Sequence, residues 1–565
     1  MESYVLDCLF CLLPSFLLFL FYVGLHCPRL CGWARVAVRA SSWRLWVIIC
    51  LILQLPLHKE KRTKAEDLKS LETDMVSGQV SDGPKLICKP TALARYLLQH
   101  CGSLTKAKLA AWPRGDPHLQ TFSSQIFGEH RQKVQFTRDH LLLKDGGIVA
   151  LDWAIGTRLI ELTAKRRWEV KKEHQSVRKT LGCFTSTPPV LLLIPQFWGG
   201  MTPHLQLLCS QAMRQGFYVV VFHHRGTAGS PLTTTRLTEF GDPSDLEQAV
   251  TYVHSRHPSS VLVAVSEGSG SGVLLSYLGE RGSSTCITAA AAISPVLLGQ
   301  LWFESAMPPI YHWGVLFHRK MQLSRYASSF QGSLDVDRAL RSSSLRDFEE
   351  ALFCSPTKKA FPSNERSLNP SYSSLRGFSP TAAWALGERA NPAQDWENYW
   401  GRNEPLRDAD EMSVPVLCIC SSDDPLLPPT SMLPLSLFQS NPYFLLALTD
   451  KGGHCGFTLE ASKDINDGKP RNEEEEEGVW SHTAILEYLK VVSDFLKEAE
   501  GDWKSWGGQL ETNSLKGQKG RMNVTALPRR RRGAMMKRSR TQPAEQSALD
   551  DADGDLFTWK RSYTR

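Results

Sequence analysis

The segment from Val261 to Gly270 places a serine where a buried strand turns into a helix. The apolar residues at its start predict a strand, and those from Val273 to Tyr277 predict a helix. A serine on such a sharp turn exposes its hydroxyl as a nucleophile when small residues lie two positions before and after it. Ala264 and Gly268 meet this requirement around Ser266. We therefore predict Ser266 as the nucleophile, although a Gly- and Ser-rich turn without chemistry has the same pattern.

A base and an acid follow this serine in the chain order that a strand–turn nucleophile requires. Asp423 and Asp424 come shortly after the apolar run 414–420, and His454 lies in a glycine-rich loop after the next run. The imidazole would accept the serine proton, and the carboxylate would hold the imidazole in the correct tautomer. Either aspartate can do this, and we prefer Asp424 because it directly precedes a Pro-Leu-Leu-Pro turn. The predicted catalytic triad is Ser266, Asp424 and His454.

Two backbone N–H groups should stabilise the oxyanion that forms in acyl transfer. One belongs to the residue after the nucleophile, which is Glu267, and the other to the loop after an early strand, where we choose Phe197. The carboxylate of Glu267 opposes a developing negative charge unless it points into solvent, has a basic partner or is protonated. Alternatively, Glu267 is an exposed residue at a helix N-terminus, where the helix dipole favours it. Both alternatives stay open.

Unbroken apolar runs alternate with helical segments from residue 190 onward. Such runs are typical of strands buried on both faces, and their alternation with helices predicts a parallel, doubly wound α/β sheet. Residues 300–411 interrupt the alternation with aromatic and helical stretches, which we interpret as a helical lid insertion. Upstream, alternating apolar residues around Asp145-Gly146-Gly147 predict a hairpin. The predicted strands are 190–194, 218–222, 260–265, 289–294, 414–420 and 443–448.

The N-terminal region contains two apolar runs. Residues 8–25 are uncharged and just long enough to span a bilayer, whereas 45–57 are short enough for a re-entrant segment, an interfacial helix or a short anchor. Acidic rather than basic residues precede the first run, which argues against a cleaved signal peptide. We expect anchoring to an intracellular membrane such as the endoplasmic reticulum, with the folded domain in the cytoplasm; secretion after cleavage is the alternative. The predicted regions are a membrane anchor at 1–57, a polar linker at 58–85, the α/β domain at 86–500 and a basic tail at 501–565.

The net charge of +7 is confined to that tail. Residues 501–565 contain fourteen Lys or Arg and seven Asp or Glu, so the first 500 residues carry no net charge. A neutral folded body argues against a nucleic-acid-binding domain. We expect the tail to be disordered and to lie against an anionic membrane surface. The cysteines lie largely in apolar runs, which indicates free thiols in a reducing compartment, and we expect no metal and no cofactor.

Three further motifs are Pro117-His118-Leu119-Gln120-Thr121, Asp145-Gly146-Gly147 with Leu151-Asp152-Trp153, and Phe222-His223-His224-Arg225-Gly226. With these motifs the chain resembles the fourth family of α/β-hydrolase domain proteins, which includes yeast medium-chain ester synthases and vertebrate acylglycerol and phospholipid hydrolases. The resemblance implies an α/β-hydrolase fold with a helical lid and a triad that cleaves lipid acyl esters. Three residues near the predicted nucleophile and oxyanion hole depart from the family pattern. Ala264 and Gln196 stand where the family usually has Gly, and Glu267 stands where it usually has Met or Leu.

Two functional hypotheses follow. The first is a membrane-associated serine hydrolase that cleaves acyl esters of acylglycerols or phospholipids through Ser266, Asp424 and His454. The second is a membrane-tethered scaffold with weak or lost activity that regulates lipid metabolism through a protein partner. Glu267 and Gln196 favour the second hypothesis, and the intact Ser-Asp-His set favours the first. The expected partners are a lipid ester and a membrane, with a regulatory protein in the second case and no nucleic acid in either.

Overall fold

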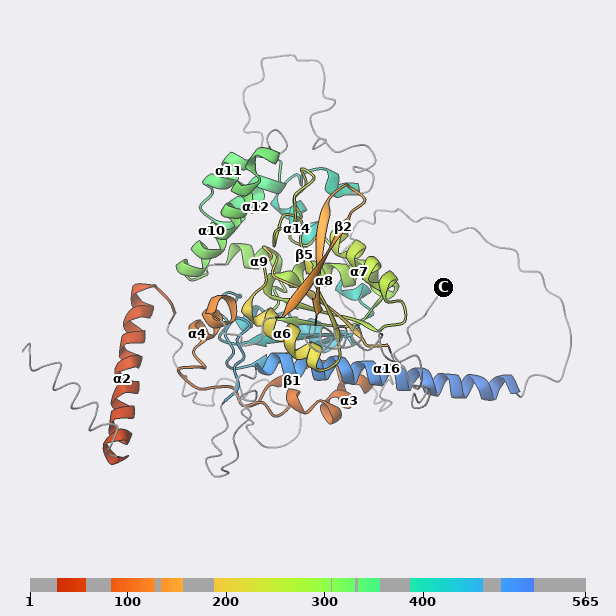
Figure 1. The fold of residues 1–565 in the computed structure, drawn as a ribbon, viewed down its shortest axis with the longest axis horizontal. Helices are drawn as coiled ribbons and strands as arrows, with labels where there is room; N and C mark the ends of the chain where they lie inside the picture. Colours follow the sequence, from red (N-terminus) through yellow and green to blue (C-terminus); the bar gives the residue numbers. More distant parts are fainter. Residues whose placement is uncertain are drawn as a thin grey trace, which may run out of the picture.

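A nine-stranded sheet forms the centre of the protein in the computed structural model (Figure 1). The structure describes residues 28–56, 83–127, 134–155, 187–305, 307–330, 334–355, 387–460 and 479–512. The strand order is β1-β9-β8-β7-β6-β4-β5-β3-β2, and the six strands from β4 to β9 pair in parallel. The strands are β1 (Lys85–Ile87), β2 (Gln135–Leu142), β3 (Ile148–Ile155), β4 (Val190–Ile194), β5 (Tyr218–His223), β6 (Leu262–Glu267), β7 (Ile287–Ile293), β8 (Val416–Ser421) and β9 (Phe444–Thr449).

Both faces of the parallel strands are buried, which explains their unbroken apolar sequences. Leu191 and Leu193 of β4 belong to one core with the helices α3, α6 and α16, whereas Leu192 belongs to the core on the opposite face with α7 and α8. The predicted α/β sheet is therefore confirmed. The predicted hairpin is also present, because β2 pairs with β3 in antiparallel fashion and Gly146 in the turn has a φ of +82°.

Helices cover the two faces of the sheet, and a further group of helices forms a lid (Figure 1). Phe303, Leu316, Phe348 and Trp400 of the lid helices pack into the same core as Leu192. The sheet-covering helices are α3 (Ala92–His100), α6 (Pro203–Arg214), α7 (Ser244–Arg256), α8 (Ser271–Arg281) and α16 (Trp480–Thr512). The lid helices are α9 (Gly299–Glu304), α10 (Pro309–Arg325), α11 (Val336–Arg341), α12 (Leu345–Phe353) and α14 (Trp396–Asn403), and the shorter helices are α4 (Pro117–Phe122) and α15 (Leu435–Ser440).

The two ends of the chain are described only in part. The apolar run 8–25 lies outside the described residues, and the run 45–57 begins within helix α2 (Pro28–Ile52). Within the described ranges, no helix combines the length and the hydropathy needed to cross a bilayer. Helix α16 continues to Thr512, past the predicted domain end at residue 500, and residues 513–565 lie outside the described part.

A buried ion-pair network ties the turn of the β2–β3 hairpin to helix α7. The Arg225 guanidinium lies 2.8 Å from Asp145 Oδ2 and 2.5 Å from Asp245 Oδ1, and its side chain is 1% exposed. Arg236 pairs with Asp145 and with Asp242. Burial alone would lower the pKa of Arg225, but the carboxylates outweigh it and raise that pKa. The network holds the loop after β5, which borders the lid.

Replacing Arg225 should destabilise the fold strongly. Arg225→Met removes the nearest cation from the buried carboxylates of Asp145 and Asp245 and leaves Arg236 alone to face both. Breaking a buried pair costs about 3–5 kcal/mol. The control is Arg338→Met, because Arg338 faces Glu350 at 3.9 Å with a side chain that is 45% exposed; such surface pairs contribute about 1 kcal/mol or less. Urea unfolding should separate the two variants clearly. Equal losses of unfolding free energy would show that the buried network does not hold the hairpin.

Candidate active site

The carboxyl ends of the parallel strands bring Asp424 and His454 together. Asp424 follows β8 and His454 follows β9, and neighbouring parallel strands direct their loops to the same edge of the sheet. The two carboxylate oxygens of Asp424 lie 2.9 and 3.2 Å from His454 Nδ1. Asp423 instead accepts a hydrogen bond from the Gly453 N–H at 2.8 Å. Asp424 therefore orients the imidazole, whereas Asp423 holds the backbone of the histidine loop.

The segment around α4 fixes the histidine loop from the other side. The N–H of His454 donates to Thr121 Oγ1 at 2.9 Å, and its carbonyl accepts from Ser124 Oγ at 2.8 Å. Gly453 has a φ of +54°, and a Cβ there would lie 2.5 Å from the carbonyl oxygen of Pro117. These contacts explain the Pro-His-Leu-Gln-Thr motif, whose threonine positions the histidine. The motif is visible in the sequence, but this role of its threonine is not.

Burial and charge act in opposite directions on His454, which is 3% exposed. Burial by itself would lower the pKa of the imidazole, but the charge of Asp424 outweighs it. The pKa of His454 therefore lies well above its usual value.

Gly268 occupies the strained position of the turn after β6. It has a φ of +50°, in the left-handed region, and it directly follows the last residue of the strand. A Cβ added to Gly268 would lie 2.9 Å from His454 Nε2 and 3.4 Å from Cγ of Gln196. In a nucleophile elbow the residue at this strained position presents its side chain to the histidine. Here that residue has no side chain.

Ser266, the predicted nucleophile, lies inside β6 rather than on the turn. It is in register with Ile194 of β4 and Ala292 of β7, and its side chain is fully buried. Its Oγ has no hydrogen-bond partner among the described residues, His454 included. The reason is that β6 extends to Glu267, two residues past the predicted strand end at 265. The structure thus brings His454 to Asp424 and Gly268 and does not join Ser266 to them.

The shift of the turn also changes the predicted oxyanion hole. The residue after the turn position is Ser269, and its Oγ accepts a hydrogen bond of 3.1 Å from the N–H of Phe197. The N–H of the predicted donor Phe197 therefore lies beside the turn and is engaged within the protein. Glu267, the other predicted donor, belongs to β6, in register with Ile293.

The carboxylate of Glu267 is neither exposed nor free. It is fully buried and accepts a hydrogen bond from Thr202 Oγ1 at 2.9 Å. His204 Nδ1 lies 3.4 Å away, and His204 Nε2 lies 2.9 Å from His482 Nε2 on α16. Of the two alternatives, the exposed helix N-terminal residue is therefore wrong. The partners of Glu267 come from Thr202 and His204 at the start of α6 and from Gln125 after α4.

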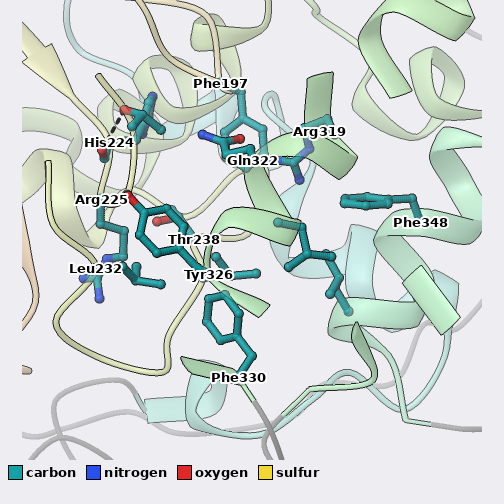
Figure 2. A pocket seen from close by; sticks show the side chains of 15 residues that line it. Phe197, His224, Arg225, Leu232, Thr238, Arg319, Gln322, Tyr326, Phe330 and Phe348 are labelled. Atoms are coloured by element: carbon teal, nitrogen blue, oxygen red, sulfur yellow. Dashed lines mark hydrogen bonds between the residues drawn. The ribbon is translucent and has the colours of Figure 1, made fainter. Parts of the chain in front are cut away.

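A small cavity lies between the lid and the loop after β4 that carries Phe197, which we call the oxyanion loop (Figure 2). Its volume is about 50 Å³, which is room for a few water molecules and too little for an acyl chain in this arrangement of the lid helices. His224 lines it, with neither ring nitrogen hydrogen-bonded within the described residues, and burial lowers its pKa to about 4. The Arg319 guanidinium lies 4.8 Å from the centre of the Phe197 ring and 2.9 Å from Glu349, which holds α10 against the loop.

The described ranges contain no candidate metal site. No group of three or more His, Cys, Asp or Glu side chains in them is arranged to hold a metal ion.

The raised pKa of His454 predicts how stability depends on pH. Protonation of His454 stabilises the fold below its unfolded-state pKa, and this contribution is lost as the pH rises through the raised pKa. We expect the difference in unfolding free energy between wild type and His454→Gln to be largest near about pH 5.5 and to shrink towards about pH 9. His140→Gln, on the exposed side of β2, is the control. A difference that grows with pH would contradict the ion pair.

Comparisons with known proteins place the chain among its relatives. The chain is 40% identical over 489 residues to human protein ABHD15, covering 86% of each chain. It is 25% identical to human phospholipase ABHD3, covering 67% of this chain and 80% of that protein. It is also 28% identical to medium-chain fatty acid ethyl ester synthase/esterase 2 of Saccharomyces cerevisiae, covering 55% and 63%.

Among solved structures, an esterase of Pyrococcus furiosus matches 72% of this chain and 98% of its own, with 12% identity and a TM-score of 0.32. No protein-family model matches the chain. The strand order, the helical lid and the extent of identity to ABHD15 lead to one conclusion. The chain belongs to the family of α/β-hydrolases that contains ABHD15 and ABHD3.

Proposed function

We propose that this protein binds acyl esters of lipids at the Asp424–His454 site and regulates lipid metabolism without forming an acyl-enzyme. One observation carries the proposal: Gly268 occupies the elbow position opposite His454 Nε2. Covalent catalysis requires a hydroxyl or thiol within hydrogen-bond reach of the base. Gly268 offers none, and Ser266 is buried in the sheet two residues earlier. The Cys455 thiol does interact with His454, but it is fully buried and is directed at the Ile293 carbonyl, away from the turn.

The relatives and the lining of the lid cavity both favour a lipid ester as the ligand. Relatives are named as a phospholipase and as a fatty acid ethyl ester synthase/esterase. The lid cavity is lined largely by apolar side chains, which suits an acyl chain once the lid has opened. The polar groups at its border suit an ester head group, because His224 has two unpaired ring nitrogens there. An uncharged or zwitterionic lipid matches the neutral charge of the first 500 residues.

A regulatory role follows from a site that can bind but lacks the covalent step. Entry of a lipid must displace lid helices, so ligand binding would change the surface that the lid presents to a protein partner. Attachment to an intracellular membrane, with the hydrolase domain in the cytoplasm, is part of the same proposal. It rests on the apolar N-terminal runs and on the basic tail.

A second candidate function is slow hydrolysis of lipid esters by water. The Asp424–His454 pair favours it, because an imidazole oriented by a carboxylate can act as a general base on a water molecule. Hydrolysis through Ser266 is a third route, and it would require β6 to release a buried strand residue towards the turn.

Labelling with a fluorophosphonate distinguishes these routes. We expect no active-site labelling of the folded wild type and none that Ser266→Ala removes. Gly268→Ser restores a hydroxyl opposite His454, so this variant should be labelled, even though a serine at positive φ costs about 1–3 kcal/mol of stability. Gly268→Ser combined with His454→Ala is the matched control and should lose the label, because the base is missing.

Two results would overturn the proposal. The first is labelling of the wild type that Ser266→Ala abolishes, because it would make Ser266 the nucleophile. The second is a Gly268→Ser variant that is folded by circular dichroism and yet remains unlabelled, because residue 268 would then not face the base. A wild type that hydrolyses a lipid ester without labelling, and loses this activity in His454→Ala, would establish the second candidate function.

A further inference from the structure

Helix α10 of the lid carries an exposed apolar stripe. Trp313, Phe317 and Met321 lie four residues apart on one face, with exposed fractions of 64%, 48% and 44%. The rings of Trp313 and Phe317 stack with their centres 5.1 Å apart. The opposite face of the helix is buried through Tyr311 and Leu323. Exposed apolar groups gathered in this way indicate an interaction surface.

Helix α2 adds a second exposed apolar surface close to the first. The C-terminal half of the helix contacts the body, where Cys50 packs with Tyr311 of α10 and with Leu426, Trp46 Nε1 donates to Asp116 at 2.9 Å, and the ring of Trp43 meets that of Trp112. Figure 1 shows α2 and α10 along the same edge of the molecule, with the rest of α2 standing clear of the body. The exposed side chains near this end are Leu45 (59%), Ile48 (52%), Leu51 (64%) and Ile52 (73%).

The charges on both helices have one sign. Helix α2 contains four arginines and no Asp or Glu. Helix α10 also has no acidic residue; its Arg319 points inward to Glu349 and its Lys320 donates to the Ser342 carbonyl, so its exposed basic residue is Arg325. Apolar and aromatic side chains combined with basic ones are typical of helices that lie in the interface of an anionic bilayer. Helix α2 is 25 residues long, but it is not apolar enough to span a bilayer. These features favour a lipid surface over a protein partner.

We infer that the α10 stripe and the exposed face of α2 together insert into the surface of an anionic membrane. This docking surface lies beside the active site, because Tyr311 and Leu426, which join the two helices, come from the lid and from the loop that carries Asp424. A lipid could then pass from the membrane to the site under the lid without crossing water. The inference goes beyond the proposed function, since it holds whether the bound lipid is hydrolysed or only recognised.

Photocrosslinking of the full chain tests this surface. The crosslinking residue p-benzoylphenylalanine replaces Trp313 or Ile48, and the control replaces Leu142, which is 70% exposed on the edge strand β2. Each protein is reconstituted with vesicles of phosphatidylcholine alone or with about one-third phosphatidylserine. We expect lipid adducts at positions 313 and 48 to exceed those at 142 by about ten-fold or more, and to increase with phosphatidylserine.

The other occupants of the surface give different adducts. Crosslinks from position 313 to a second copy of the chain would show that the stripe is a dimer interface, and equal lipid adducts at 313 and 142 would show general membrane proximity. Either result overturns the inference. Neither depends on labelling of the Gly268→Ser variant, so this inference and the proposed function can fail separately.

Discussion

The packing of His454 against the backbone of Gly268 is the constraint on which the whole site depends. A Cβ at residue 268 would lie 2.9 Å from the imidazole nitrogen, and a Cβ at Gly270 would lie 2.1 Å from the carbonyl oxygen of Pro195. The turn after β6 is therefore closed by two glycines, and the imidazole fills the space into which a nucleophile would project. The proposed loss of the covalent step rests on this backbone contact and not on the position of the lid.

The rest of the catalytic framework is kept around that contact. Asp424 orients the imidazole, Thr121 holds its backbone, and Phe197 presents its N–H at the turn. The Phe197 N–H is used within the protein, because it donates a hydrogen bond to Ser269 Oγ. Arg319 of α10 lies against the Phe197 ring, so the oxyanion loop and the lid are in direct contact. A ligand that opens the lid must break that contact, which links the site to the exposed face of α10.

The parallel sheet could be predicted from the sequence, because unbroken apolar runs are typical of strands that are buried on both faces. The chain order also predicted that Asp424 and His454 lie side by side, since loops after neighbouring parallel strands meet at one edge of the sheet. The register of the turn could not be predicted. Ser266 and Glu267 are polar and suggest that the strand has ended, but the sheet continues through them because Thr202 and His204 satisfy the Glu267 carboxylate. Those partners lie more than sixty residues away in the chain, so local sequence contains no sign of them.

The most direct test of the central claim is intact-protein mass spectrometry after incubation with an activated acyl ester. An acyl-enzyme adds the mass of the acyl group to one residue, and trypsin mapping locates it. Gly268 opposite His454 predicts that the folded wild type gains no acyl group at Ser266 or at Ser269. A stoichiometric acyl adduct on Ser266 that disappears in His454→Ala would contradict the account, because it would place the nucleophile two residues before the turn.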